Sequence, residues 1–176
     1  MPKEVPDSQK QKTDLILSKM TTHKMNKLEE HLNILAAKIA NQEAYNDKVS
    51  KSNVGWHIEH ILLTISLVIE SVKKSNPKHY KWSFKLPRIL VLYMKKIPRG
   101  RAKSPQVVVP KTYSEESLKE RLEYAKLLIQ ELQNINPVQY FNHPFFGNLK
   151  LNKTITFLEI HTEHHLKIIN DILENK

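Results

Sequence analysis

The spacing of the apolar residues most constrains what this chain can fold into. Four long segments repeat them at intervals of three and four residues, which is the period of an α-helix that buries one face. Only three glycines occur, and the prolines gather at the N-terminus and at the joins between these segments. Because glycine and proline mark turns and chain breaks, their distribution predicts long helices with few tight turns.

The first two predicted helices lie in the N-terminal half of the chain. One begins at Thr21 or Thr22, either of which could be its N-cap, and ends near Tyr45. The residues before it, 1–20, are expected to form an N-terminal extension that could include a short helix. Asn53 could be the N-cap of the other helix, which covers about 53–74. The apolar residues of this helix surround most of its circumference, which is typical of a heavily buried helix.

The C-terminal half begins with a long connection, 76–112, which five prolines interrupt. We expect an irregular crossover there, with one short helix at about 87–96. The third long helix covers about 114–133, and an irregular link rich in aromatic residues, about 134–152, follows it. The fourth long helix then extends to about Glu174.

These elements predict an all-α fold in a single domain, 1–176: a four-helix bundle with a long irregular crossover between helices two and three. The chain has no cysteine, which excludes a disulfide scaffold, a thiolate zinc site and a cysteine nucleophile. Its N-terminus lacks the apolar core of a signal peptide, and its longest mostly apolar run, "IEHILLTISLVIE", is too short to span a bilayer. We therefore expect a cytoplasmic protein with no membrane partner.

The net charge of +10 has the sign that would favour an anionic partner. The lysines are distributed over nearly every segment, and no arginine-rich run or aromatic-basic RNA motif occurs, so we expect a solvated basic surface rather than nucleic-acid binding. The densest positive run is "KKIPRGRAK". Its residues Lys95, Lys96, Arg99 and Arg101 are candidates for binding an anionic cofactor, and a solvated loop is the alternative.

Histidines are concentrated on the second and fourth predicted helices. His161 and His165 belong to a seam with steps of three and four residues, which faces the interior of a bundle, whereas His164 lies to one side. The other members of the seam are Leu158, Ile168 and Ile172. Two histidines four residues apart can place two imidazole nitrogens on one metal ion. On the second helix, His57 and His60 lie one turn apart within an apolar surface.

A core histidine more often bonds to a carbonyl or a side chain than to a metal, and this alternative stays open. Burying several imidazoles without partners would cost about 1–3 kcal/mol each. A divalent metal ion is one partner that could serve all of them, so the spacing predicts a metal site. His143, in the loop "NHPFFG", is expected to fix that loop instead.

The stretches "GWHIEHI" and "HPFFGNLKLNKTITFLEIHTEHHLKII", separated by the long crossover, make the chain similar to the DinB-like (YfiT-type) superfamily of bacterial four-helix bundles. The likeness covers about 20–174 and is closest to an uncharacterised branch; its most specific part is H-x-x-H-H. It implies a divalent metal, nickel or zinc, held by three histidines, which correspond here to His60, His161 and His165. His57 could be a fourth ligand, a group behind the ligands or an acid–base residue, so the catalytic residues stay unknown.

Three neutral nitrogen ligands leave a coordination position open for water or substrate, which is typical of catalytic sites. The superfamily that the chain resembles includes enzymes that use low-molecular-weight thiols such as bacillithiol, mycothiol or glutathione. The resemblance therefore implies a metal-dependent transferase or hydrolase-type enzyme with a small-molecule substrate, and in particular a thiol S-transferase. A non-catalytic binding or scaffold protein is the alternative, and a basic nucleic-acid-associated protein is less favoured. A homodimer is left open.

Overall fold

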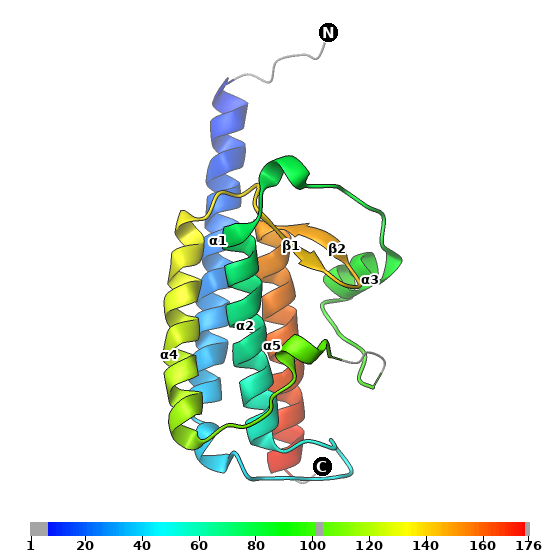
Figure 1. The fold of residues 1–176 in the computed structure, drawn as a ribbon. Coiled ribbons are helices and arrows are strands. Elements are labelled where there is room, and N and C mark those ends of the chain that lie inside the picture. The colour runs from blue at the N-terminus through cyan, green and yellow to red at the C-terminus, as the bar shows by residue number, and fades with distance from the viewer. Residues whose placement is uncertain (1–6, 101–103, 175–176) are drawn as a thin grey trace.

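The computed structural model describes residues 7–100 and 104–174, with the backbone alone for 7–18 and 20 (Figure 1). Four long helices pack side by side: α1 (Asp7–Ala36), α2 (Val54–Lys74), α4 (Glu115–Glu131) and α5 (Leu151–Leu173). Helices α1 and α2 each pack against both α4 and α5. The predicted four-helix bundle is confirmed, and the residues that separate α2 from α4 form the expected crossover.

The core is one continuous cluster of leucine and isoleucine side chains from all four helices, including Leu28, Ile61, Leu128 and Leu158. Each of these four side chains is almost completely inaccessible to solvent. Among the described residues, no helix combines the length and the apolar character that a membrane crossing requires.

The first helix differs from its predicted bounds at both ends. Helix α1 begins at Asp7 rather than near Thr21, and it ends at Ala36 rather than near Tyr45. Nothing between Asp7 and Thr21 breaks a helix, since this stretch is rich in good helix formers and holds no glycine or proline. After Ala36 the chain tightens into the 3₁₀ helix η1 (Ile39–Asn41), which no glycine or proline signals in advance.

Helix α2 has the predicted bounds and the predicted cap. The side chain of Asn53 accepts a hydrogen bond from the backbone N–H of Trp56 at 2.9 Å. The hydroxyl of Tyr113, just before α4, donates to the same oxygen at 2.6 Å. This single amide therefore fixes the start of α2 and also ties it to the end of the crossover, close to the histidines of α2.

The crossover contains the predicted short helix, α3 (Leu86–Met94), between the 3₁₀ helices η2 (Pro77–His79) and η3 (Gln106–Val108). Arg88 attaches α3 to the rest of the protein, because its buried guanidinium donates to the carbonyl oxygens of Ser83 and Phe146. The crossover is therefore anchored at its centre, although it runs outside the bundle (Figure 1).

The link before α5 is a β-hairpin, so the expectation of an irregular link was wrong. Strands β1 (Tyr140–His143) and β2 (Gly147–Lys150) pair antiparallel, with Tyr140 opposite Lys150. Gly147 has a φ of 68°, a conformation that favours glycine and lets the chain reverse. Strands of four residues are too short for alternation to distinguish them from a loop.

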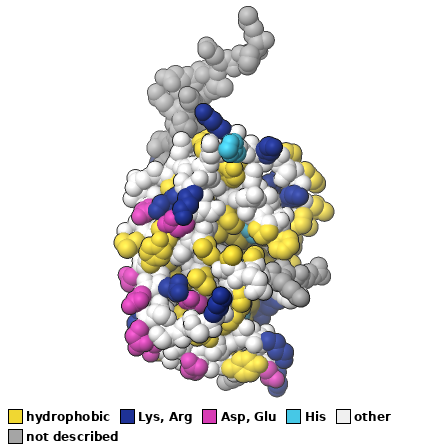
Figure 2. Space-filling model, in the orientation of Figure 1, with side chains coloured by type: hydrophobic (Ala, Val, Ile, Leu, Met, Phe, Trp, Pro, Cys, Tyr) yellow, Lys and Arg dark blue, Asp and Glu magenta, His cyan; other side chains and the backbone are white. Residues whose placement is uncertain are grey.

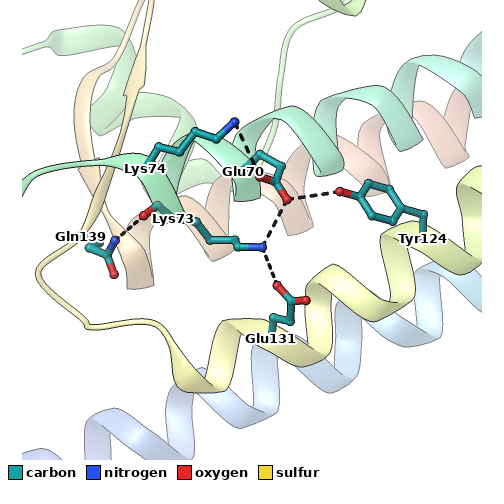
Figure 3. A network of polar contacts seen from close by, with 6 residues as sticks. All are labelled: Glu70, Lys73, Lys74, Tyr124, Glu131 and Gln139. Carbon is teal, nitrogen blue, oxygen red and sulfur yellow. Dashed lines mark hydrogen bonds and ion pairs between the residues drawn. The ribbon is translucent and has the colours of Figure 1, made fainter.

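A polar network joins α2, α4 and this hairpin (Figure 3). The ammonium of Lys73 on α2 pairs with Glu70 at 3.3 Å and with Glu131 on α4 at 2.7 Å. The amide of Gln139 donates to the carbonyl oxygens of Val72 and Lys73 in the last turn of α2, where carbonyls have no partner further along the helix. The network fixes the last turn of α2 relative to the hairpin.

Candidate metal site

The packing of α2 against α5 brings three histidines together. His60 on α2 and His165 on α5 are buried, and His161 on α5 is half-buried. Nitrogen atoms of all three rings, one from each, lie within 4.8 Å of one another. These are the three residues that the sequence pattern and the family resemblance selected.

The ring of His60 is held in one orientation. Its Nδ1 lies 2.7 Å from the carbonyl oxygen of Val108 in η3. A carbonyl only accepts hydrogen bonds, so Nδ1 carries the proton and Nε2 keeps its lone pair. The indole of Trp56 stacks on the same ring at a centroid distance of 5.0 Å. His60 therefore presents the lone pair of Nε2 toward His161 on α5.

The spacing of His60 and His161 fits two ligands of a tetrahedral ion. Nε2 of His60 lies 3.2 Å from Nε2 of His161. Two nitrogen ligands of a tetrahedral ion, with bonds of about 2.0–2.1 Å, are about 3.3–3.4 Å apart. The donor set of three imidazoles also suits zinc or nickel. The residues present therefore fit the divalent metal that the resemblance implies.

His165 is oriented by a chain of contacts that begins with His57. The Nδ1 atoms of His57 and His165 lie 3.0 Å apart, and Nε2 of His57 lies 2.9 Å from Oγ of Ser50. If His165 binds a metal through Nε2, its proton is on Nδ1 and is donated to His57. His57 then donates its own Nε2 proton to Ser50. In that arrangement both nitrogens of His57 are engaged in hydrogen bonds.

The three ligand candidates are uncharged near neutral pH. Burial lowers the pKa of His60, an effect that its bond to Val108 partly offsets. Burial lowers the pKa values of His161 and His165 well below 6.5, and the neighbouring histidines lower them further. Burial, together with the charges of neighbouring groups, also lowers the pKa of His57 to about 4. Neutral imidazole is the form that binds metal.

The comparison with known protein families agrees with this geometry. Residues 21–169 match the family model of the DinB superfamily. The chain belongs to the DinB superfamily. No curated protein and no solved structure gave a match to it.

In this DinB superfamily member, Nδ1 of His161 is buried and has no hydrogen-bond partner among the described residues. An unpartnered buried polar atom costs about 1–3 kcal/mol. An apolar side chain at this position of α5 would avoid that cost. The fold alone therefore does not explain why a histidine occupies the seam here.

The other predicted residues lie around the site. His164 is not part of the three-histidine group, although its ring contacts that of His165 at a centroid distance of 5.0 Å. Lys95 and Lys96 are exposed, and Arg99 pairs with Asp171 on α5 at 2.7 Å. Arg101 lies outside the described residues.

Although it pairs with Asp171, Arg99 also contributes to the electrostatics of the histidine group. Burial is the main reason that the pKa of His164 is lowered, and the charge of Arg99 is the next. Arg99 also lowers the pKa of His57, after burial and the neighbouring histidines. Arg99 thus lies close enough to His57 and His164 for its charge to affect their protonation.

His143 stabilises the hairpin turn, as expected. Its Nδ1 accepts hydrogen bonds from the backbone N–H groups of Phe145 at 3.1 Å and Phe146 at 3.2 Å. Its ring stacks on that of Phe146 at a centroid distance of 4.1 Å. Phe157 contacts both His143 and His161, so it separates the turn from the histidine group.

Three residues that contact His60 or His57 were not predicted from the sequence: Trp56, Val108 and Ser50. Trp56 had a signal, since an aromatic residue four positions before His60 lies on the same helix face. Val108 had none, because it acts through its main-chain carbonyl. Ser50 lies in a polar loop that resembles any other turn in the sequence.

Proposed function

We propose that this chain binds one divalent metal ion, zinc or nickel, through His60, His161 and His165, and uses it in an enzymatic reaction on a small molecule. The observation that carries the proposal is the convergence of three neutral imidazoles whose nitrogens lie within 4.8 Å of one another. In one pair, His60 and His161, the Nε2 atoms are at the spacing of two ligands of a tetrahedral ion. The proposed reaction class is a transferase or hydrolase-type reaction, with a low-molecular-weight thiol as the expected co-substrate.

A bound divalent ion supplies a Lewis acid that lowers the pKa of a coordinated water or thiol. The protein's own residues do the rest. The carbonyl of Val108 holds His60 in the binding tautomer, and His57 orients His165. Arg99 is a basic side chain whose charge acts on both His57 and His164, so it is our candidate for attracting an anionic thiol.

The first test is the metal content of the purified chain, without a polyhistidine tag and after loading with Zn²⁺ or Ni²⁺. We expect about one ion per chain in the wild type. His60→Ala, His161→Ala and His165→Ala should each lose stoichiometric metal. His164→Ala and His31→Ala should largely retain it, because His164 lies beside the group and His31 is a buried histidine on α1. Equal loss from all five variants would refute the ligand assignment.

The second test addresses the thiol. Titrating glutathione or bacillithiol into the Co²⁺-loaded protein should produce a sulfur-to-metal charge-transfer absorption, since a thiolate would enter the open position. Arg99→Gln should weaken this binding and leave the metal content unchanged. Stoichiometric metal without any thiol signal would contradict the S-transferase assignment and leave the metal site standing. A chain without metal would favour the non-catalytic scaffold protein.

A further inference from the structure

Residues 71–114 have a charge distribution unlike the rest of the chain. They hold twelve Lys or Arg residues and no acidic residue, since no Asp or Glu stands between Glu70 and Glu115. Outside this stretch the chain carries sixteen basic and eighteen acidic residues. Residues 71–114, the last turn of α2 and the crossover, therefore account for the whole net positive charge, and a partner that they attract is anionic.

An apolar surface lies in the middle of this basic stretch. Seven of the fifteen exposed large hydrophobic side chains in the described chain fall within residues 82–94. The outermost of them is Tyr93, which is 88% exposed. We call these seven the α3 surface: Trp82, Phe84, Leu86, Ile89, Leu90, Tyr93 and Met94. A concentration of this kind on a protein surface marks an interaction site.

Helix α3 is apolar on both of its sides. Its one charged residue, Arg88, is buried and faces the hairpin, with its guanidinium 5.7 Å from the ring centroid of Trp82. Val91 and Leu92 are partly buried and pack against the core. A helix that is apolar all round is normally covered on all sides. The outward side of α3 therefore has the character of a surface that a partner covers.

Exposed lysines border the α3 surface. Lys85 lies just before α3, and Lys95 and Lys96 follow it. Burial is the main reason that the pKa of Lys24 on α1 is lowered, and the charges of Lys153 on α5 and of Lys95 lower it further. The charge of Glu159 partly offsets this lowering. Positive charges from three elements thus meet at the end of α3.

The view in Figure 2 agrees with this distribution. Hydrophobic side chains and Lys or Arg side chains share the right-hand side, where Figure 1 places α3 and the hairpin. Acidic side chains in this view lie mainly on the left and at the bottom. In this view, the side of the molecule that carries the crossover thus shows hydrophobic and basic side chains and hardly any acidic ones.

We propose that the α3 surface binds the surface of an anionic lipid bilayer. Leu86, Ile89 and Leu90 would enter the headgroup region beside Trp82, while the bordering lysines meet anionic headgroups. The expectation of no membrane partner rested on the lack of a spanning segment, and surface binding needs none. The proposal is independent of the metal site.

Two other occupants fit less well. A second copy of the chain, meeting this one through the same surface, would bring two wholly basic crossovers together, and like charges oppose such contact. Nucleic acid would satisfy the lysines through its phosphates but would leave the aliphatic side chains of α3 uncovered. A bilayer with anionic lipids matches both the charge and the apolar area.

The experiment is co-sedimentation of the full chain with vesicles of phosphatidylcholine alone or of an equimolar mixture of phosphatidylcholine and phosphatidylglycerol. We expect binding to the mixed vesicles, little to the neutral ones, and weaker binding as salt is raised. The fluorescence of exposed Trp82 should shift to the blue on binding. Trp82→Phe should abolish the shift, because the chain's other tryptophan, Trp56, is inside the histidine site.

Matched variants separate the two parts of the interaction. Leu86→Ser/Leu90→Ser should weaken binding at least about tenfold. The control is Leu67→Ser/Leu127→Ser, which removes two exposed leucines from α2 and α4. Lys81 and Lys85 are exposed and stand next to Trp82 and Phe84 in the chain. Lys81→Gln/Lys85→Gln should weaken binding about 25-fold, at about fivefold per lysine.

Equal binding to both kinds of vesicle, no binding to either, or an equal loss in the leucine control would overturn the proposal. It would likewise fail if the α3 surface instead mediates a dimer, or if duplex DNA binds and the vesicles do not. Metal content should be unchanged in every one of these variants. Failure here therefore leaves the proposed metal function intact, and failure of the metal function leaves this proposal intact.

Discussion

Replacing His57 tests how the metal site is built. His57 lies one turn before His60 and makes a 3.0 Å contact with Nδ1 of His165, while its other nitrogen contacts Ser50. In His57→Phe the ring volume is nearly kept, but the proton on Nδ1 of His165 loses its acceptor. His165 is only 7% exposed, so water cannot readily replace the lost partner.

The expected effect is a weaker metal site rather than a lost one. Partners that orient a metal ligand typically contribute about 10–100-fold to affinity. This corresponds to about 1.4–2.8 kcal/mol, which agrees with the cost of about 1–3 kcal/mol for an unpaired buried donor. His57→Asn should recover part of the loss, because its amide oxygen can accept the same proton. Ser50→Ala acts one step further away and should cost less than tenfold.

The assay is a competition between the protein and a chromophoric chelator for Zn²⁺. His31→Phe is the matched control, since His31 is also a buried histidine but lies on α1. An unchanged dissociation constant for His57→Phe would refute the orienting role. Complete loss of metal, as expected for His165→Ala, would show instead that His57 is itself a ligand.

Two further predictions follow from other parts of the structure. Burial lowers the pKa of His143 from 6.5 to about 4, so the unfolded chain binds its proton more readily, and stability falls as pH drops from about 6.5 to about 4. In the metal-free protein, His143→Asn keeps the hydrogen-bond acceptor of the turn and should remove about 3 kcal/mol of this pH dependence, as measured by urea unfolding across that range. Gly55→Ala would place a Cβ 2.5 Å from the ring of Tyr113 and should destabilise the fold by about 1–3 kcal/mol. An unchanged urea midpoint would show that Tyr113 moves aside at no cost.

Much of the helical framework could be predicted because its signals are local. The cap at Asn53 and the breaks caused by proline depend on residues next to one another in the chain. The errors had local causes too. No glycine or proline marks the end of helix α1 at Ala36, and the hairpin at Tyr140–Lys150 is too short for its alternation to be recognised.

The α3 surface was missed for a different reason. Lysines occur in nearly every segment, so counting them alone suggests that the positive charge is evenly distributed along the chain. The asymmetry is in the acidic residues, which are absent between Glu70 and Glu115. The exposure of Leu86 and Leu90 is also hidden in the sequence, where an apolar helix such as 87–96 predicts burial.

The sequence by itself determined which helix face carries His161 and His165, because the period of 3.6 residues fixes how side chains within one helix relate to each other. Only the tertiary structure decided that His60, about a hundred positions earlier, lies 3.2 Å from His161, since the relative placement of α2 and α5 depends on core packing. The tertiary structure also decided that the carbonyl of Val108 accepts the Nδ1 proton of His60 and so fixes its tautomer. A main-chain carbonyl is common to every residue, and only folding gives one of them a particular partner.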